Sequence, residues 1–110
     1  SDSEQYDRLF HALADASRRQ MVERLSRGPA SMKALAAGAG VGLPSALKHL
    51  RVLEEGGVVV STKAGRTRTF QLQPDALSSI TSWVEGREKA LTAGFDRLAA
   101  AMVELPEEEP

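Results

Sequence analysis

The 110-residue sequence contains no cysteine, and aromatic residues make up only 5% of it. The absence of cysteine excludes disulfides, thiolate metal sites and thiol redox switches. The sequence has two histidines, His11 and His49, which we expect on separate helices. Because a zinc site normally needs four imidazole, thiolate or carboxylate ligands, we predict neither a bound metal nor any other cofactor.

Long apolar runs are also missing. No run approaches the roughly 18–20 apolar residues that a membrane-spanning helix needs. The polar and acidic N-terminus, SDSE, does not have the pattern of a secretory signal peptide. We therefore expect a cytoplasmic protein that has no membrane partner.

The residue types that carry enzymatic chemistry do not come together in this sequence. It shows no cluster of carboxylates and no nucleophile next to a base. The glycine-rich stretch at residues 38–42 follows no predicted strand and precedes no P-loop lysine, so it does not match a phosphate-binding loop. We therefore predict that the protein is not an enzyme.

The formal net charge is −1, but the charged residues are unevenly distributed. Residues 42–73 carry five basic and two acidic side chains, whereas residues 74–110 carry three basic and eight acidic ones. A positively charged segment of this kind favours contact with a nucleic acid. Ordinary variation of surface charge explains it about equally well.

The positively charged segment has the pattern of a helix followed by a hairpin. Residues 43–55 place apolar side chains on one side of a helix, with Pro44 in the first turn. The β-branched residues 58–62 and the alternating residues 67–72 are typical of two strands. Gly65, between the strands, can adopt the positive φ that a tight turn needs. This order of elements is the layout of a winged helix-turn-helix, which binds DNA.

We therefore predict a mainly α-helical protein with a small β-hairpin (an α+β fold), a winged helix-turn-helix of about five helices. Residues 1–110 are expected to form a single domain for DNA binding and dimerisation. Within it, the helix-turn-helix spans about residues 31–56, the wing about residues 58–73, and a C-terminal dimerisation helix about residues 75–105.

Six polar side chains of the segment are the candidates for contact with DNA. They are Ser45, Lys48, His49, Arg51, Arg66 and Arg68. Lysine, arginine, serine and histidine side chains all donate to phosphates or to base edges. For the lysine and the two wing arginines, the alternative is an ordinary solvated charge. For Arg51 it is an ion pair with Glu55 one helical turn away, and for His49 it is a structural place at the margin of the core.

A second helix is predicted to begin near Arg18 and Arg19, with Asp15 or Ser17 as its cap. Both arginines either contact the DNA backbone or pair with Asp15 and Glu23, and the sequence does not distinguish these roles.

The last predicted helix is long and amphipathic. Its apolar residues recur at three- and four-residue steps over about thirty residues, which is roughly 45 Å of helix. So long a helix cannot bury its whole apolar stripe on a body of this size, and we expect it to pack against a second copy of the chain. The alternative is that it bends back over its own domain at Gly86 or Gly94.

Four stretches of the sequence are similar to motifs of one known family. They are residues 9–19 (LFHALADASRR), 43–53 (LPSALKHLRVL), 54–59 (EEGGVV) and the wing at 65–72. The first three resemble the motifs ALADPTRR, QPTVSKHLRVL and EEAGLV of the ArsR family of winged-helix transcriptional repressors, and the fourth resembles that family's wing. The similarity spans about residues 6–100.

The resemblance implies a sequence-specific transcriptional regulator, a homodimer that binds a palindromic double-stranded DNA operator and blocks transcription. It implies that the first and last helices form the dimer interface. The candidate interface residues are Leu9, Leu13, Trp83, Val84, Leu91, Phe95, Leu98 and Met102. Many relatives sense metals, but this sequence lacks those ligands. The effector is therefore an unidentified small molecule or protein, or there is none.

The sequence departs from the family pattern at Gly42 and Leu47, where relatives commonly have serine. Gly42 still serves as a helix N-cap, although a weaker one. Leu47 either contacts the methyl group of a thymine or extends the core. A leucine at this place on the recognition helix also motivates the alternative function, a winged-helix module that binds protein and not DNA.

Overall fold

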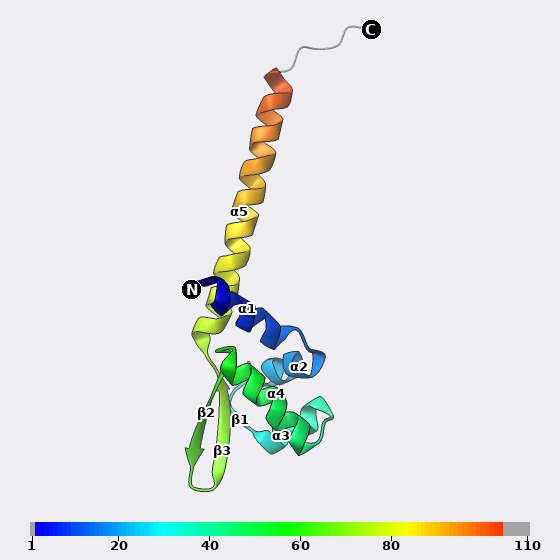
Figure 1. The fold of residues 1–110 in the computed structure, drawn as a ribbon, viewed down its shortest axis with the longest axis vertical. Helices are drawn as coiled ribbons and strands as arrows, with labels where there is room; N and C mark the ends of the chain where they lie inside the picture. Colours follow the sequence, from blue (N-terminus) through cyan, green and yellow to red (C-terminus); the bar gives the residue numbers. More distant parts are fainter. Residues whose placement is uncertain (1, 105–110) are drawn as a thin grey trace. The chain divides into compact units, whose positions relative to one another are not determined.

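The computed structural model describes residues 2–104, and the chain divides after Leu77 into two compact units, the first unit (residues 1–77) and the second unit (residues 78–110). The helices and strands of the described residues are labelled in Figure 1. They are α1 (Asp2–Leu13), α2 (Ala16–Leu25), β1 (Ala30–Ser31), α3 (Met32–Ala39), α4 (Leu43–Glu55), β2 (Val59–Ala64), β3 (Thr67–Leu72) and α5 (Pro74–Glu104). The predicted winged helix-turn-helix with about five helices is confirmed. Leu105, the predicted end of the last helix, lies outside the described residues.

Local sequence signals begin and end the helices of the first unit. Asp15 is the N-cap of α2, where its carboxylate accepts a hydrogen bond of 3.0 Å from the backbone N–H of Arg18. Ser31 caps α3 in the same way, through a bond of 3.2 Å from the N–H of Ala34. After α3, Gly40 has a φ of 67°, the left-handed conformation that favours glycine at a helix C-terminus.

The wing is the antiparallel hairpin of β2 and β3, and β1 pairs with the other edge of β3. In the two-residue loop between Ala64 and Thr67, Gly65 has a φ of 64°, as the sequence predicted. Because β1 pairs with β3, the sheet has three strands, and the strand β1 was not predicted from the sequence. It places Ala30 opposite Phe70. A strand of two residues is too short to show the alternation of apolar and polar side chains that predicts a strand, so only its pairing with β3 identifies it.

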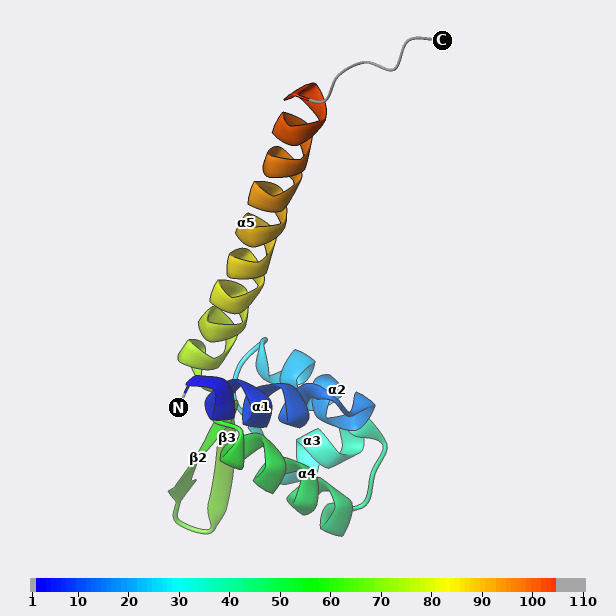
Figure 2. The same cartoon turned by 45° about the horizontal axis from the view of Figure 1, so that its top comes forward.

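Helices α1–α4 and the sheet enclose the core of the first unit, whose arrangement is visible in Figure 2. The largest fully buried side chains are Phe70, Met21, Leu35, Leu50, Leu53 and Val58. The apolar residues of 43–55 were predicted on one side of this helix; Ala46, Leu50 and Leu53 are buried there, whereas Leu43, at the start of the helix, is 48% exposed. Leu9 is also buried, with 3% of its surface exposed. Within the single chain α1 contacts α4 and α2, so Leu9 lies in the core of its own chain, and its place in a dimer interface stays a prediction.

The C-terminal end of α4 lies so close to α1 that Gly56 has no room for a side chain. A Cβ atom at Gly56 would lie 2.7 Å from the Cβ of Ala12 and 2.9 Å from the carbonyl oxygen of Arg8. The φ of Gly56 is −76°, so the backbone tolerates alanine and only crowding opposes it. Gly57 is the reverse case, because it has open space around it but a φ of 74°.

Gly56→Ala should therefore lower the free energy of unfolding by about 2–3 kcal/mol, the upper part of the range expected for overpacking in a tight core. Gly57→Ala should lower it by only about 1 kcal/mol, the cost of a left-handed conformation for a residue with a Cβ atom. Urea unfolding followed by circular dichroism measures both values. If Gly56→Ala were no less stable than Gly57→Ala, the close packing of α4 on α1 would be wrong.

The helix α5 runs unbroken for 31 residues, through both Gly86 and Gly94. The helix therefore shows no bend at Gly86 or Gly94, the two positions at which the sequence allowed one.

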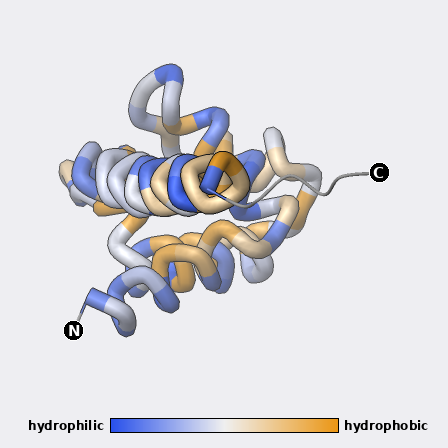
Figure 3. Tube along the Cα trace, turned by 90° about the horizontal axis from the view of Figure 1, so that it is seen from above, coloured by the Kyte–Doolittle hydropathy of each residue, from blue (hydrophilic) through white to orange (hydrophobic). Residues whose placement is uncertain are grey.

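Seen almost along its axis, α5 carries hydrophobic and hydrophilic residues in turn (Figure 3). Within residues 2–104, we find no helix that combines the length and the apolar character of a membrane span.

Candidate nucleic-acid interface

The helix α4 has one buried side and one exposed side. Ala46 and Leu50 are completely buried in the core. At 100° per residue, Lys48 lies opposite this buried side, and Ser45 lies beside Lys48. Both side chains are exposed. Gly42 is the N-cap, as predicted, and it offers no side-chain hydrogen bond to the first turn. Pro44 has no backbone N–H, so the N–H groups of Leu43 and Ser45 are the donors at the positive end of the helix dipole.

The wing adds two arginines. Arg66 is exposed in the loop at the tip of the hairpin, next to Gly65. Arg68 lies on β3, and one of its terminal nitrogens donates to the hydroxyl of Ser61 on β2 at 3.0 Å. This bond crosses the hairpin and holds the guanidinium on one face of it. Two views show the tip of the hairpin and the N-terminal end of α4 on the same side of the first unit (Figures 1 and 2).

A cleft of about 260 Å³ lies between α4 and β3. Its lining residues are Leu47, Leu50, Arg51, Glu54, Arg68 and Phe70. The cleft brings together Arg51 and Arg68, two predicted DNA contacts from different elements. Leu47 is 38% exposed and lines the same cleft. Its side chain is therefore accessible beside the two cations and is not part of the core.

His49 lies at the other edge of the exposed side of α4, next to the start of α2, and is half-buried. Its Nδ1 atom is 3.3 Å from a terminal nitrogen of Arg18 and 3.8 Å from a carboxylate oxygen of Asp15. One edge of the imidazole ring thus has partners within the chain. A structural role and a role in binding DNA do not exclude each other here, because the second ring nitrogen lies on the other edge.

Arg18 and Arg19 both cap the C-terminal end of α1. The Nε of Arg18 donates to the carbonyl of Ala12 at 2.7 Å, and a terminal nitrogen donates to that of His11 at 3.0 Å. Arg19 donates to the carbonyl of Leu13 at 2.9 Å. The last carbonyls of a helix have no partners within the helix and lie at its negative end, so guanidinium groups are favourable there. These bonds give both side chains partners within the chain, and their contacts with phosphate stay untested.

The charges around the N-cap of α2 also affect its carboxylate. The hydrogen bond from the Arg18 backbone lowers the pKa of Asp15 below its ordinary 3.8, and the charges of His49 and Arg18 lower it further, against the opposing effect of desolvation. The folded pKa is therefore below the unfolded one. The carboxylate stabilises the folded protein fully above the unfolded pKa, and this stabilisation is lost as the pH falls through the lowered value.

We therefore expect Asp15→Asn to be less stable than the wild type at neutral pH, by an amount that shrinks as the pH falls below the ordinary value of 3.8. Asparagine keeps the N-cap hydrogen bond, so the variant removes mainly the charge. Urea midpoints of both proteins, measured from neutral pH down to acid pH well below 3.8, test this. A difference that stays constant over this range would contradict the lowered pKa of Asp15.

Several exposed apolar side chains of the last helix follow one side of it, and we call these the α5 stripe. They are Val84, Leu91, Phe95, Leu98 and Met102, each at least 40% exposed. Trp83 lies at the flank of the stripe, with the guanidinium of Arg87 5.5 Å from its ring centroid. Among the residues predicted at the dimer interface, Leu13 on α1 is half-buried.

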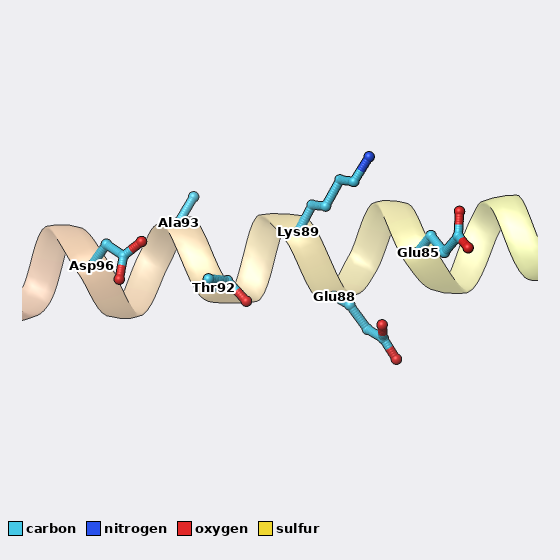
Figure 4. A pocket seen from close by; sticks show the side chains of 6 residues that line it. All are labelled: Glu85, Glu88, Lys89, Thr92, Ala93 and Asp96. Carbon is cyan, nitrogen blue, oxygen red and sulfur yellow. The ribbon is translucent and has the colours of Figure 1, made fainter.

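A polar strip occupies a different face of α5. Its residues are Glu85, Glu88, Lys89, Thr92, Ala93 and Asp96. Figure 4 shows that all six come from this one helix and that Glu88 and Lys89 point to different sides. The strip is therefore open helix surface and not a cavity for a ligand. Among residues 2–104, we find no group of three or more histidine, aspartate or glutamate side chains that is placed to hold a metal ion.

Helices α3 and α4 and the hairpin β2–β3 together define the class of this protein, the winged helix-turn-helix proteins. The chain matches a family model described as a helix-turn-helix domain over residues 13–62. It is 40% identical over 74 residues to the HTH-type transcriptional regulator Rv2034 of Mycobacterium tuberculosis. This match covers 67% of the present chain and 69% of the relative.

Solved structures lead to the same family. The crystal structure of the ArsR family transcriptional regulator RHA00566 is similar with a TM-score of 0.76 at 36% identity, over 82% of this chain and 93% of that one. The homodimeric winged helix-turn-helix DNA-binding domain Mb0332 of Mycobacterium bovis gives a TM-score of 0.65 at 26% identity, over 79% and 82% of the two chains. The chain belongs to the ArsR family of winged helix-turn-helix transcriptional regulators. The predicted resemblance is thus confirmed, and these relatives are regulators and not enzymes.

Proposed function

We propose that the protein is a transcriptional repressor that binds a palindromic DNA operator as a homodimer. The observation that carries the proposal is the placement of its cations. Lys48 lies in the middle of the exposed side of α4, and Arg66 and Arg68 lie on a wing whose tip is on the same side of the first unit. An α-helix fits the major groove, where lysine and serine donate to base edges or phosphates. The arginines of the wing then contact flanking phosphates.

The dimer is proposed from the exposed apolar side chains of α5. Leu91, Phe95, Leu98 and Met102 are 57–62% exposed in the single chain. Monomeric proteins rarely expose a contiguous apolar surface of this kind, and a second copy covers it by presenting the same stripe. The homodimeric state of the Mycobacterium bovis relative supports this assignment. Two copies also match a palindrome, whose half-sites lie about one helical turn apart.

Gel retardation of a labelled DNA fragment from upstream of the protein's own gene tests the proposal. We expect the fragment to be retarded at low salt, a coding fragment of equal length to be bound more weakly, and transcription from the fragment to fall when the protein is added. The logarithm of the affinity should decrease linearly with the logarithm of the salt concentration, by about 0.9 for each phosphate contact. A folded dimer that retards neither fragment would refute the proposed function.

Leu47 should give the protein a preference for thymine at one position of each half-site. Its exposed side chain lies beside Arg51 and Arg68 in the cleft between α4 and the wing, and we propose that it makes an apolar contact with the C5-methyl group of a thymine. Uracil differs from thymine only by this methyl group. In an operator selected by the wild type, replacing one thymine with uracil should weaken binding about fourfold, the value of one buried methyl group. Leu47→Ala should lose this sensitivity, and equal uracil sensitivity in both proteins would contradict the contact.

A further inference from the structure

The side chain of Arg18 connects three helices of the first unit. Arg18 lies in the first turn of α2. Two nitrogens of its guanidinium group donate to the carbonyls of Ala12 and His11 in the last turn of α1. A third nitrogen lies 3.3 Å from Nδ1 of His49 on α4. The bonds to α1 fix the guanidinium in place, and the remaining contact is directed at the helix that carries the proposed DNA contacts.

This contact determines which nitrogen of His49 carries a proton. An arginine side chain has only donors, so Nδ1 of His49 is the acceptor. A neutral imidazole has a single N–H group, and an acceptor at Nδ1 leaves that proton on Nε2. The carboxylate of Asp15, 3.8 Å from the same Nδ1, faces the same edge of the ring. The carboxylate favours a proton on Nδ1, but the guanidinium is the closer of the two groups and can only donate, so we assign the N–H group to the other edge of the ring.

We propose that Arg18 is a positioning residue for DNA binding, which ties α4 to the end of α1 and holds His49 in the tautomer whose Nε2–H donates to the operator. This inference rests on the proposed function, since the donor is assigned to DNA. The His49 side chain is 22% exposed, so it is partly accessible to a bound duplex. A donor that is already oriented loses little freedom when it binds a phosphate.

Arg19 supplies a matched control. It caps the same end of α1, through the carbonyl of Leu13 at 2.9 Å, and it also begins in the first turn of α2. The contact with His49 is made by Arg18. Loss of capping at α1 is therefore common to Arg18→Ala and Arg19→Ala, whereas loss of control over His49 is specific to Arg18→Ala.

The experiment measures the binding of a duplex selected from random sequence by the wild type, for Arg18→Ala, Arg18→Lys, Arg19→Ala, His49→Ala and the Arg18→Ala, His49→Ala double variant. Arg18→Lys keeps the positive charge and guards against a variant that fails to fold, and circular dichroism reports folding for each. We expect Arg18→Ala and Arg18→Lys to bind about tenfold more weakly, within the range of one charge-assisted hydrogen bond. Arg19→Ala should lose less than about twofold, and the double variant should bind no more weakly than His49→Ala, since Arg18 acts through His49.

Long-range ¹H–¹⁵N spectra of the imidazole give a readout that needs no DNA. The wild type and Arg19→Ala should show the Nε2–H tautomer of His49, and both Arg18 variants should show a mixture of tautomers. The inference is overturned if Arg18→Ala binds like Arg19→Ala, if the effects of Arg18→Ala and His49→Ala add fully, or if the tautomer does not change. If the wild type binds no duplex at all, the proposed function is refuted, and so is the role in DNA binding that we assign to Arg18.

Discussion

Leu91→Glu combined with Phe95→Glu should convert the protein from a dimer into a folded monomer that no longer binds its operator. Both side chains are 60% exposed on the α5 stripe and neither belongs to the buried core of the first unit. The burial of a leucine or phenylalanine contributes about 1.5–3 kcal/mol, and two-fold symmetry places each residue in the interface twice. The substitutions also bury uncompensated carboxylates, which is costly in itself. The dissociation constant of the dimer should therefore rise at least about 1000-fold, or about 4 kcal/mol.

Sedimentation velocity measures the mass of this variant, circular dichroism its helix content, and gel retardation its binding to the operator. The matched control is Thr92→Glu combined with Ala93→Glu, which adds the same charge to the polar strip of the same helix. We expect this control to remain a dimer and to retain its affinity for DNA. If the Leu91 and Phe95 variant stayed a dimer, the α5 stripe would not be the surface that joins two copies.

Lys48→Ala combined with Arg66→Ala should weaken operator binding at least about 100-fold near physiological salt. A dimer loses four cations in this way, two from the middle of the exposed sides of α4 and two from the tips of the wings. If each of the four contacts a phosphate, the slope of log affinity against log salt should become less steep by roughly 3 to 4. Stability should change little, because both side chains are exposed.

The control for this variant is Lys89→Ala combined with Arg97→Ala, which removes the same charge from the exposed surface of α5. It separates a local contact from a general loss of positive charge. The same pair of variants distinguishes the alternative function, a winged-helix module that binds protein and not DNA. Under that alternative, promoter occupancy in cells would be unchanged by loss of Lys48 and Arg66, whereas our proposal predicts that it falls.

Elements with strong local signals could be predicted from the sequence. The cap of α2, which the sequence placed at Asp15 or Ser17 and the structure places at Asp15, and the turn at Gly65 follow from side-chain chemistry within a few residues. The period of the apolar residues placed Lys48 and Ser45 on the exposed side of α4, where the structure has them. Their contacts with DNA stay predictions.

Features that depend on residues far apart could not be predicted in this way. Strand β1 exists only through its pairing with β3, which lies about forty positions later in the chain. The contact between Arg18 and His49 joins residues that are 31 positions apart. Leu9 illustrates a third limit, because an apolar position on an amphipathic helix packs equally well on its own chain or on a partner, and its spacing is the same in both cases.

A hydroxyl-radical footprint of the wild type on its selected operator tests the central claim most directly. If two copies of α4 bind one face of a duplex, we expect two protected regions about 10 base pairs apart. Outside each of them, the DNA backbone should also be protected where the wing arginines contact it. A single protected region, or uniform protection without a helical period from a protein that is dimeric in the same buffer, would contradict this account.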